Sequence, residues 1–309
     1  MKNLIKFYRR YSNWVNAVVP LGLVWLSLQL GISQFWGWGL FAILSYMFIA
    51  MIIGAIYTRI RYGFKLPNED NYNLKGDYIL PFNGEWTVVA GGIDEKHAHG
   101  SGKILPPLRY AYDFSIIYEN EEEAKLARES TVDFPTNLDE YPAYGKDVIA
   151  VADGEVVVAV RHHPESRVGG FKTYNDTTDE RGNFVVIKHH KGEYSLTAHL
   201  QYGSILVKKG DMVKQGQVIA KCGNSGNTNA PHLHFQLQSG KYAWFSAGLP
   251  IAFSNIKAKQ SDYYKDLFVD TGKPMPTVEN NLKVIEKKSY IGRGLDVENG
   301  ADESHVGGV

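Results

Sequence analysis

Cysteine is nearly absent from this chain of 309 residues, which has Cys222 as its single thiol. One cysteine excludes an intrachain disulfide and a cysteine-rich zinc site. Any bound metal ion must therefore be held mainly by histidine, aspartate or glutamate. Cys222 itself is expected to be a small buried residue, because that is the usual role of a lone cysteine.

Acidic side chains are missing from residues 1–65, which carry seven Lys and Arg. The formal net charge of the whole chain is +0, so the remainder is acidic by the same amount. Such opposed segments indicate contact with a membrane or a nucleic acid at one end. Here the basic residues flank apolar sequence, which favours a lipid bilayer as partner. The acidic remainder argues against nucleic acid.

Charge of either sign is absent from Tyr11 to Thr58, a run of 48 residues. One bilayer-spanning helix needs ~20 apolar residues, so the run is too long for one span and suits two. We expect spans at about 15–32 and 35–56, which would make residues 1–65 a transmembrane hairpin. The polar stretch 66–78 is typical of a linker.

Residues 79–255 contain many short apolar or alternating runs separated by turn residues. These runs are 86–90, 110–117, 148–151, 155–160, 183–188, 194–199, 205–207, 218–220 and 232–237. Short strands with frequent turns predict an all-β antiparallel sandwich or half-barrel. Large apolar residues become few in the last part of the chain, so 256–309 is expected to be an extension with a weakly ordered tail.

Histidines carry the clearest chemical signal. His232 and His234 are separated by one residue on a predicted strand, so both imidazoles would lie on one face of the sheet. His199 ends another alternating run. Asp113 interrupts an apolar strand, and a buried carboxylate requires a cation or several hydrogen bonds. Two imidazoles and a carboxylate of this kind are typical ligands of a divalent metal ion.

Several motifs around these residues occur in the order found in one known family. They are Ala150–Gly154, Arg181–His189, Thr197–Leu200, Val207–Ile219 and His232–Phe235. Over about residues 85–255 the sequence resembles the lysostaphin-type zinc metallopeptidases, which cut peptide cross-links of the bacterial cell wall. The resemblance implies a fold of the duplicated-hybrid-motif type and excludes the hairpin and the tail, which lie beyond it.

The resemblance also implies one zinc ion per chain, with Asp113 and His234 as ligands and with His199 and His232 as the catalytic pair. The family's first ligand usually stands four residues before the aspartate, where this chain has Arg109. A variant branch takes that histidine from further upstream. His97 and His99 lie there, and His99 is preferred from its spacing after Gly91 and Gly92.

Three protein ligands leave a fourth position of a zinc ion open for water, which is typical of catalytic sites. The chain has no His-Glu-x-x-His motif, so an imidazole of His199 or His232 is the expected general base. Together with the apolar N-terminal run, the resemblance implies a membrane-anchored zinc endopeptidase acting on peptidoglycan peptides. The alternative is a catalytically inactive relative that regulates other wall hydrolases.

The location of the domain relative to the membrane follows from two arguments that oppose each other. Lys and Arg lie on both flanks of the apolar hairpin and are absent from its short connection, which favours cytoplasmic flanks. An enzyme that cuts cell wall must lie outside the cytoplasm. The sequence therefore predicts a protein integral to the cell membrane and leaves the side of its peptidase domain open.

Overall fold

The chain separates into two compact units, residues 1–67 and 68–309. The computed structural model describes residues 45, 49, 66–93, 99, 106–116, 137–168, 179–243, 246–261, 283–285, 289–291, 293 and 295–300. Apart from residues 45 and 49, both expected transmembrane spans lie outside this set. Within the described residues, no helix has both the length and the apolar character needed to cross a bilayer.

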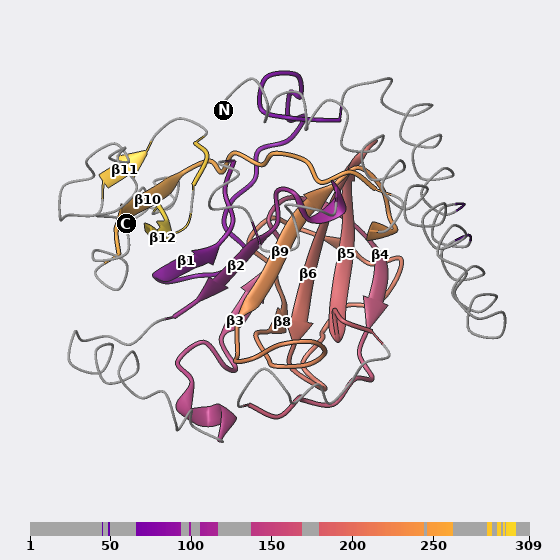
Figure 1. The fold of residues 1–309 in the computed structure, drawn as a ribbon, viewed down its shortest axis with the longest axis vertical. Coiled ribbons are helices and arrows are strands. Elements are labelled where there is room, and N and C mark those ends of the chain that lie inside the picture. Colours follow the sequence, from indigo (N-terminus) through magenta and orange to yellow (C-terminus); the bar gives the residue numbers. More distant parts are fainter. Residues whose placement is uncertain are drawn as a thin grey trace, which may run out of the picture. The chain divides into compact units, whose positions relative to one another are not determined.

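The second unit is built around one large antiparallel sheet (Figure 1). Its ten strands are β1 (Trp86–Ala90), β2 (Tyr112–Ser115), β4 (Gly154–Val160), β5 (Asn183–His190), β6 (Glu193–Leu200), β7 (Met212–Val213), β9 (Leu233–Gln238), β10 (Ile256–Gln260), β11 (Lys283–Ile285) and β12 (Leu295–Asn299). They follow the order β11-β10-β12-β1-β2-β9-β6-β5-β4-β7. The all-β antiparallel fold expected from the sequence is confirmed.

A second, two-stranded sheet pairs β3 (Asp147–Ile149) with β8 (Val218–Lys221). Single 3-10 turns occur at η2 (Pro106–Leu108), just before β2, and at η3 (Leu138–Glu140). The run 205–207 forms no strand, although the backbone N–H of Leu206 donates to the carbonyl of Ile219.

Alternation along β9 directs its side chains to opposite faces of the large sheet. Leu233, Phe235 and Leu237 enter the main core, which also contains Val148 and Ile219 of the small sheet. The opposite face carries a smaller apolar cluster, formed by Phe184, Val186, Leu196 and Ala198. Burying each large apolar side chain contributes about 1.5–3 kcal/mol, so the three apolar residues of β9 hold this strand against the main core.

The C-terminal strands differ from the expectation of a weakly ordered tail. β12 pairs with β1 in the register Trp86 to Val297, and β10 pairs with the other edge of β12. Val297 is fully buried, and the Thr87 hydroxyl donates to Asp296 at 2.5 Å. The segment has few apolar residues, but its order comes from strand pairing with a region about 200 residues earlier in the chain.

The polar stretch before the sheet is bound to the domain through one buried carboxylate. Glu193, at the start of β6, has no exposed surface and accepts hydrogen bonds from Tyr72 Oη at 2.9 Å and Tyr78 Oη at 2.5 Å. The backbone N–H of Lys75 donates to it at 2.8 Å. Residues 72–78 therefore have a fixed position on the β-domain.

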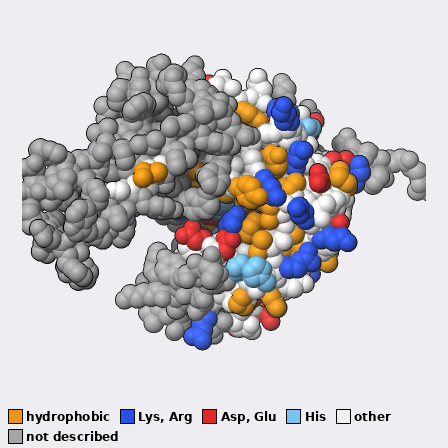
Figure 2. Space-filling model, turned by 90° about the vertical axis from the view of Figure 1, so that its right-hand side faces the viewer, with side chains coloured by type: hydrophobic (Ala, Val, Ile, Leu, Met, Phe, Trp, Pro, Cys, Tyr) orange, Lys and Arg blue, Asp and Glu red, His pale blue; other side chains and the backbone are white. Residues whose placement is uncertain are grey.

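Charged and apolar side chains alternate over the face of the molecule that Figure 2 presents, where Lys and Arg are spread among apolar residues. Among described residues, the most exposed large apolar side chains are Leu206 and Met212. Apolar side chains on such a mixed surface are ordinary, because folded proteins lack enough polar surface to cover themselves.

Two glycines bring the loop between β8 and β9 against the turn before β5. Gly182 (φ +61°) and Gly226 (φ +83°) lie so close that a Cβ added at Gly182 would be 2.3 Å from the carbonyl carbon of Ser225. The Ser225 hydroxyl donates to the carbonyl of Leu200 at 2.7 Å and accepts the backbone N–H of Asn183 at 2.9 Å. The loop is thus fixed beside the end of β6.

We expect Gly182→Ala to lower the free energy of unfolding by about 3 kcal/mol, because it adds a backbone clash to the strain of a positive φ. Gly203→Ala is the matched control, since Gly203 also has a positive φ (+74°) but nothing lies within 4 Å of its added Cβ. That variant should lose about 1 kcal/mol. Urea denaturation of both variants measures the difference, and equal losses would contradict the close approach.

Candidate active site

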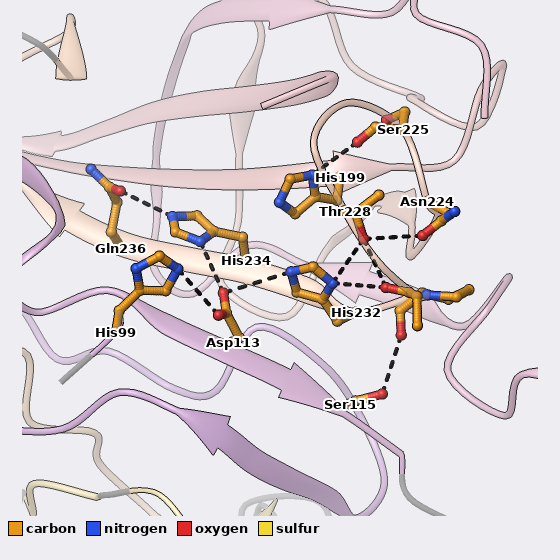
Figure 3. A network of polar contacts seen from close by, with 12 residues as sticks. His99, Asp113, Ser115, His199, Asn224, Ser225, Thr228, His232, His234 and Gln236 are labelled. Carbon is orange, nitrogen blue, oxygen red and sulfur yellow. Dashed lines mark hydrogen bonds and ion pairs between the residues drawn. The ribbon is translucent and has the colours of Figure 1, made fainter. Parts of the chain in front are cut away.

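The centre of the site is a cross-strand pair. Asp113 of β2 lies directly opposite His234 of β9, and Asp113 Oδ1 is 3.0 Å from His234 Nδ1 (Figure 3). His99 approaches the other carboxylate oxygen, with its Nε2 at 3.2 Å from Asp113 Oδ2. The structure therefore brings together the three residues chosen from the sequence as ligands. His97 lies outside the described residues.

The three side chains fit a zinc ion. Each offers one ligand atom, and these atoms lie within 4.8 Å of one another. Two imidazole nitrogens and one carboxylate oxygen are a common donor set of catalytic zinc. Ligand atoms at 2.0–2.1 Å in a tetrahedron are about 3.3 Å apart, close to the two contacts above. Among the described residues, His99 Nδ1 is buried without a hydrogen-bond partner, so only its other nitrogen is engaged in the site.

Arg109 does not occupy the place of the ion. Its guanidinium donates to the carbonyls of Gly92 at 3.4 Å and Ile93 at 2.6 Å and lies 4.4 Å from the centre of the Tyr110 ring. The residue at the family's usual ligand position thus binds two backbone carbonyls in the segment that precedes His99.

The charge of Asp113 is stabilised by its neighbours. Burial opposes ionisation, but hydrogen bonds to His234 and His99 and the nearby His232 outweigh it and hold the pKa of Asp113 well below its usual range. In turn, burial disfavours the charged form of His99, yet the Asp113 carboxylate raises the pKa of that imidazole. A carboxylate that is charged at neutral pH suits a metal ligand.

His199 and His232 form a second pair beside the ligands, with ring centroids 4.6 Å apart. His199 Nδ1 is 2.8 Å from the carbonyl of Ser225, and His232 Nδ1 is 2.9 Å from the carbonyl of Ala230. A carbonyl can only accept a hydrogen bond, so each Nδ1 carries the proton. The lone pair of each neutral ring is therefore at Nε2, and that of His232 lies 3.7 Å from Asp113 Oδ1.

Burial favours the neutral form of both rings of this pair. Burial lowers the pKa of His199 well below its usual value, and the imidazoles of His232 and His234 lower it further. Burial also lowers the pKa of His232, although Asp113 opposes that shift. A neutral imidazole with its free nitrogen near the metal ligands can act as a general base.

The backbone at His199 has a conformation that few residues adopt. Its φ is +59°, in the left-handed region, which costs of order 1–3 kcal/mol for a residue with a side chain. Two hydrogen bonds stabilise it, since its N–H donates to Arg181 at 3.0 Å and its carbonyl accepts from Gly223 at 3.0 Å. This turn directs the imidazole toward the site at the point where β6 ends.

Sequence reasoning missed the groups that orient these histidines. Ser225 and Ala230 act through backbone carbonyls, and Thr228 Oγ1 lies 3.1 Å from His232 Nδ1. Such contacts leave no pattern in the sequence beyond the small polar residues of the loop. Gln236 accepts from His234 and could have been found, because it continues the alternation after His234.

His189 and Cys222 have structural roles, and the role of Cys222 confirms the expectation from the sequence. His189 makes structural hydrogen bonds, at 2.8 Å to the carbonyl of Asp153 and at 2.8 Å to the Ser195 hydroxyl. Cys222 is fully buried, and burial raises the pKa of its thiol, so it is an unreactive core residue.

Comparison with known proteins finds a family that part of the β-domain resembles. Residues 136–244 match the model of Peptidase family M23. The matched range holds His199, His232 and His234, whereas His99 and Asp113 precede it and are joined to the site by the fold.

Individual relatives match part of the chain. The peptidoglycan DD-endopeptidase ShyA of Vibrio cholerae is 35% identical over 121 residues, which are 38% of this chain and 24% of that protein. The murein hydrolase activator EnvC of Escherichia coli is 35% identical over 94 residues, 30% of this chain and 18% of that protein. Among solved structures, a zinc-containing peptidase from Vibrio cholerae is 24% identical, with 52% of this chain and 36% of that chain covered and a TM-score of 0.32.

The chain thus spans a quarter or less of the length of these curated relatives. The segment that matches the M23 model contributes His234 to an intact His/Asp metal-binding triad with His99 and Asp113, so the β-domain resembles an M23 metallopeptidase domain.

Proposed function

We propose that this chain is a membrane-anchored zinc endopeptidase that hydrolyses peptide bonds in peptidoglycan cross-links. The observation that carries the proposal is that two sets of functional residues lie side by side. One is the metal triad of His99, Asp113 and His234. The other is the neutral pair of His199 and His232, each with its Nε2 unprotonated.

A zinc ion held by the triad would supply Lewis-acid activation of a water molecule and of the scissile carbonyl. Residues of the chain would then carry out the proton transfers. An imidazole of the neutral pair accepts a proton from the attacking water at Nε2, because its Nδ1 is already committed to a carbonyl. The resulting imidazolium can donate that proton to the leaving amine. The second imidazole can hydrogen-bond the developing oxyanion only when its Nε2 is protonated, because its Nδ1–H is donated to a backbone carbonyl.

Peptidoglycan is supported as substrate by the similarity to ShyA, which is described as a peptidoglycan DD-endopeptidase. The match to EnvC, described as an activator, keeps the regulatory alternative in view. A regulator requires neither a metal triad nor a pair of neutral histidines. The presence of both sets therefore supports hydrolysis.

The purified chain is expected to contain one zinc ion and to release peptides from isolated peptidoglycan. His99→Ala, Asp113→Ala and His234→Ala should each lower zinc affinity on the order of 100-fold or more, because a ligand matters more than its supporting contacts. Metal analysis and mass spectrometry of the digest measure both properties. His189→Ala is the matched control, since this half-buried histidine lies in the same sheet but outside the site. A wild-type chain without zinc would refute the proposal.

His199→Ala and His232→Ala should keep zinc and lose roughly 10²–10⁴-fold in kcat, as expected for a lost general acid or base. The pH profile of kcat/KM gives a second readout. Because burial lowers the pKa of both imidazoles, the neutral form persists below pH 6.5, and the acidic limb of the wild-type profile should lie below that value. Wild-type kcat in either variant would remove that histidine from the mechanism.

Membrane anchoring by residues 1–65, with the peptidase domain outside the cytoplasm, belongs to the same proposal. Its support is the uncharged run of 48 residues and the location of the substrate. A reporter that is active only outside the cytoplasm, fused after residue 65, should be active, whereas the same reporter fused after residue 33 should be silent. Both fusions should remain with the membrane fraction. The reverse pattern would place the domain in the cytoplasm, as the charge bias favours.

A further inference from the structure

Three polar side chains occupy one face of β9 at every second position. His234 is 7% exposed, Gln236 1% and Gln238 0%. A buried amide costs about 1–3 kcal/mol when it lacks partners, so these glutamines require hydrogen bonds on that face. The bonds that they make connect His234 to the backbone beyond the end of the strand.

In these hydrogen bonds each side chain donates to the next group along the chain, in the direction away from His234. Gln238 Nε2 donates to the carbonyls of Gly240 at 2.8 Å and Lys241 at 3.4 Å, which turns its Oε1 toward Gln236. Gln236 Nε2 donates to that oxygen at 2.6 Å and to the carbonyl of Pro107 at 3.3 Å. The remaining oxygen of Gln236 faces His234 Nε2 at 3.1 Å (Figure 3).

The backbone carbonyls fix this direction at two independent points. Carbonyl oxygens only accept hydrogen bonds, so the amide groups of Gln238 and Gln236 must present their NH₂ to Gly240 and Pro107. Reversing the Gln236 amide would place its oxygen against the oxygens of Pro107 and Gln238. The nitrogen of His234 that faces Gln236 therefore meets an acceptor and carries a proton.

We propose that Gln236 is a positioning residue that selects the tautomer of His234 in which Nδ1 is free to bind the metal. A ring that binds a metal through Nδ1 carries its one proton at Nε2, where Gln236 accepts it, whereas without a metal Nδ1 faces the Asp113 carboxylate as a hydrogen-bond donor. Gln238 acts one step further away by holding the Gln236 amide in place. The inference rests on the proposed zinc site and adds to it the groups that prepare one ligand.

The position of Asp113 explains why the tautomer of His234 has to be selected. Its carboxylate lies 3.0 Å from His234 Nδ1 and would by itself favour a proton on that nitrogen. That tautomer cannot bind a metal through Nδ1. Gln236 offers the proton an alternative partner on the far side of the ring.

Three variants separate the role of the acceptor from that of packing. Gln236→Met removes the acceptor at similar volume and should weaken zinc binding by roughly 10–100-fold. Gln236→Glu keeps an acceptor at His234 and should restore affinity to within a few fold of the wild type, although its second oxygen faces the Pro107 carbonyl and should lower thermal stability. Gln238→Met leaves Gln236 bonded to Pro107 and should cause a smaller loss of affinity than Gln236→Met.

Zinc affinity of the full chain is measured by competition with a chelating dye, starting from metal-free protein. In parallel, ¹⁵N NMR of histidine-labelled, zinc-loaded wild type reports the tautomer of His234 without any variant, and a protonated Nε2 is expected. Gln236→Met with wild-type affinity, Gln236→Glu as weak as Gln236→Met, or an unprotonated Nε2 would each overturn the inference. A wild-type chain that binds no zinc would instead overturn the proposed function.

Discussion

The register between β2 and β9 places a carboxylate inside a sheet, and the rest of the site follows from that constraint. Asp113 of β2 lies opposite His234 of β9, which in turn lies opposite Ala198 of β6. A buried carboxylate is tolerated only with strong compensation. His234 and His99 supply it at 3.0 and 3.2 Å, and the same three groups are the ones that fit a zinc ion. The same contacts therefore stabilise the charge of Asp113 and bring the metal ligands together.

Much of this arrangement could be predicted from the sequence, because strand alternation is local. The run 86–90 coincides with β1, and the separation of His232 and His234 by one residue placed two imidazoles together. The strands β10 and β12 were missed because their order depends on pairing with β1, far away in the chain. His99 comes from a segment without strand periodicity, so only the resemblance to a family pointed to it, and its choice over His97 rested on spacing.

The position of the catalytic pair depends on backbone rather than on side-chain packing. His199 lies at a left-handed turn, and its ring is oriented by a carbonyl of the loop after β8. That loop can approach only because Gly182 and Gly226 lack a Cβ where their backbones touch. Strain at His199 is compensated by hydrogen bonds to two neighbouring segments. A precise base position is therefore obtained from groups that carry no chemical signature of catalysis, which is why sequence patterns did not reveal them.

Backbone carbonyls determine the protonation pattern of the histidines in both halves of the site, with opposite results. For His199 and His232 a carbonyl accepts directly from Nδ1, so Nε2 is left free to take a proton. For His234 the carbonyls of Pro107 and Gly240 act through two glutamine amides and place the proton at Nε2, so Nδ1 is left free for a metal. Imidazoles of identical chemistry thus become either bases or ligands. The difference lies in which ring nitrogen meets an acceptor, and the fold decides it.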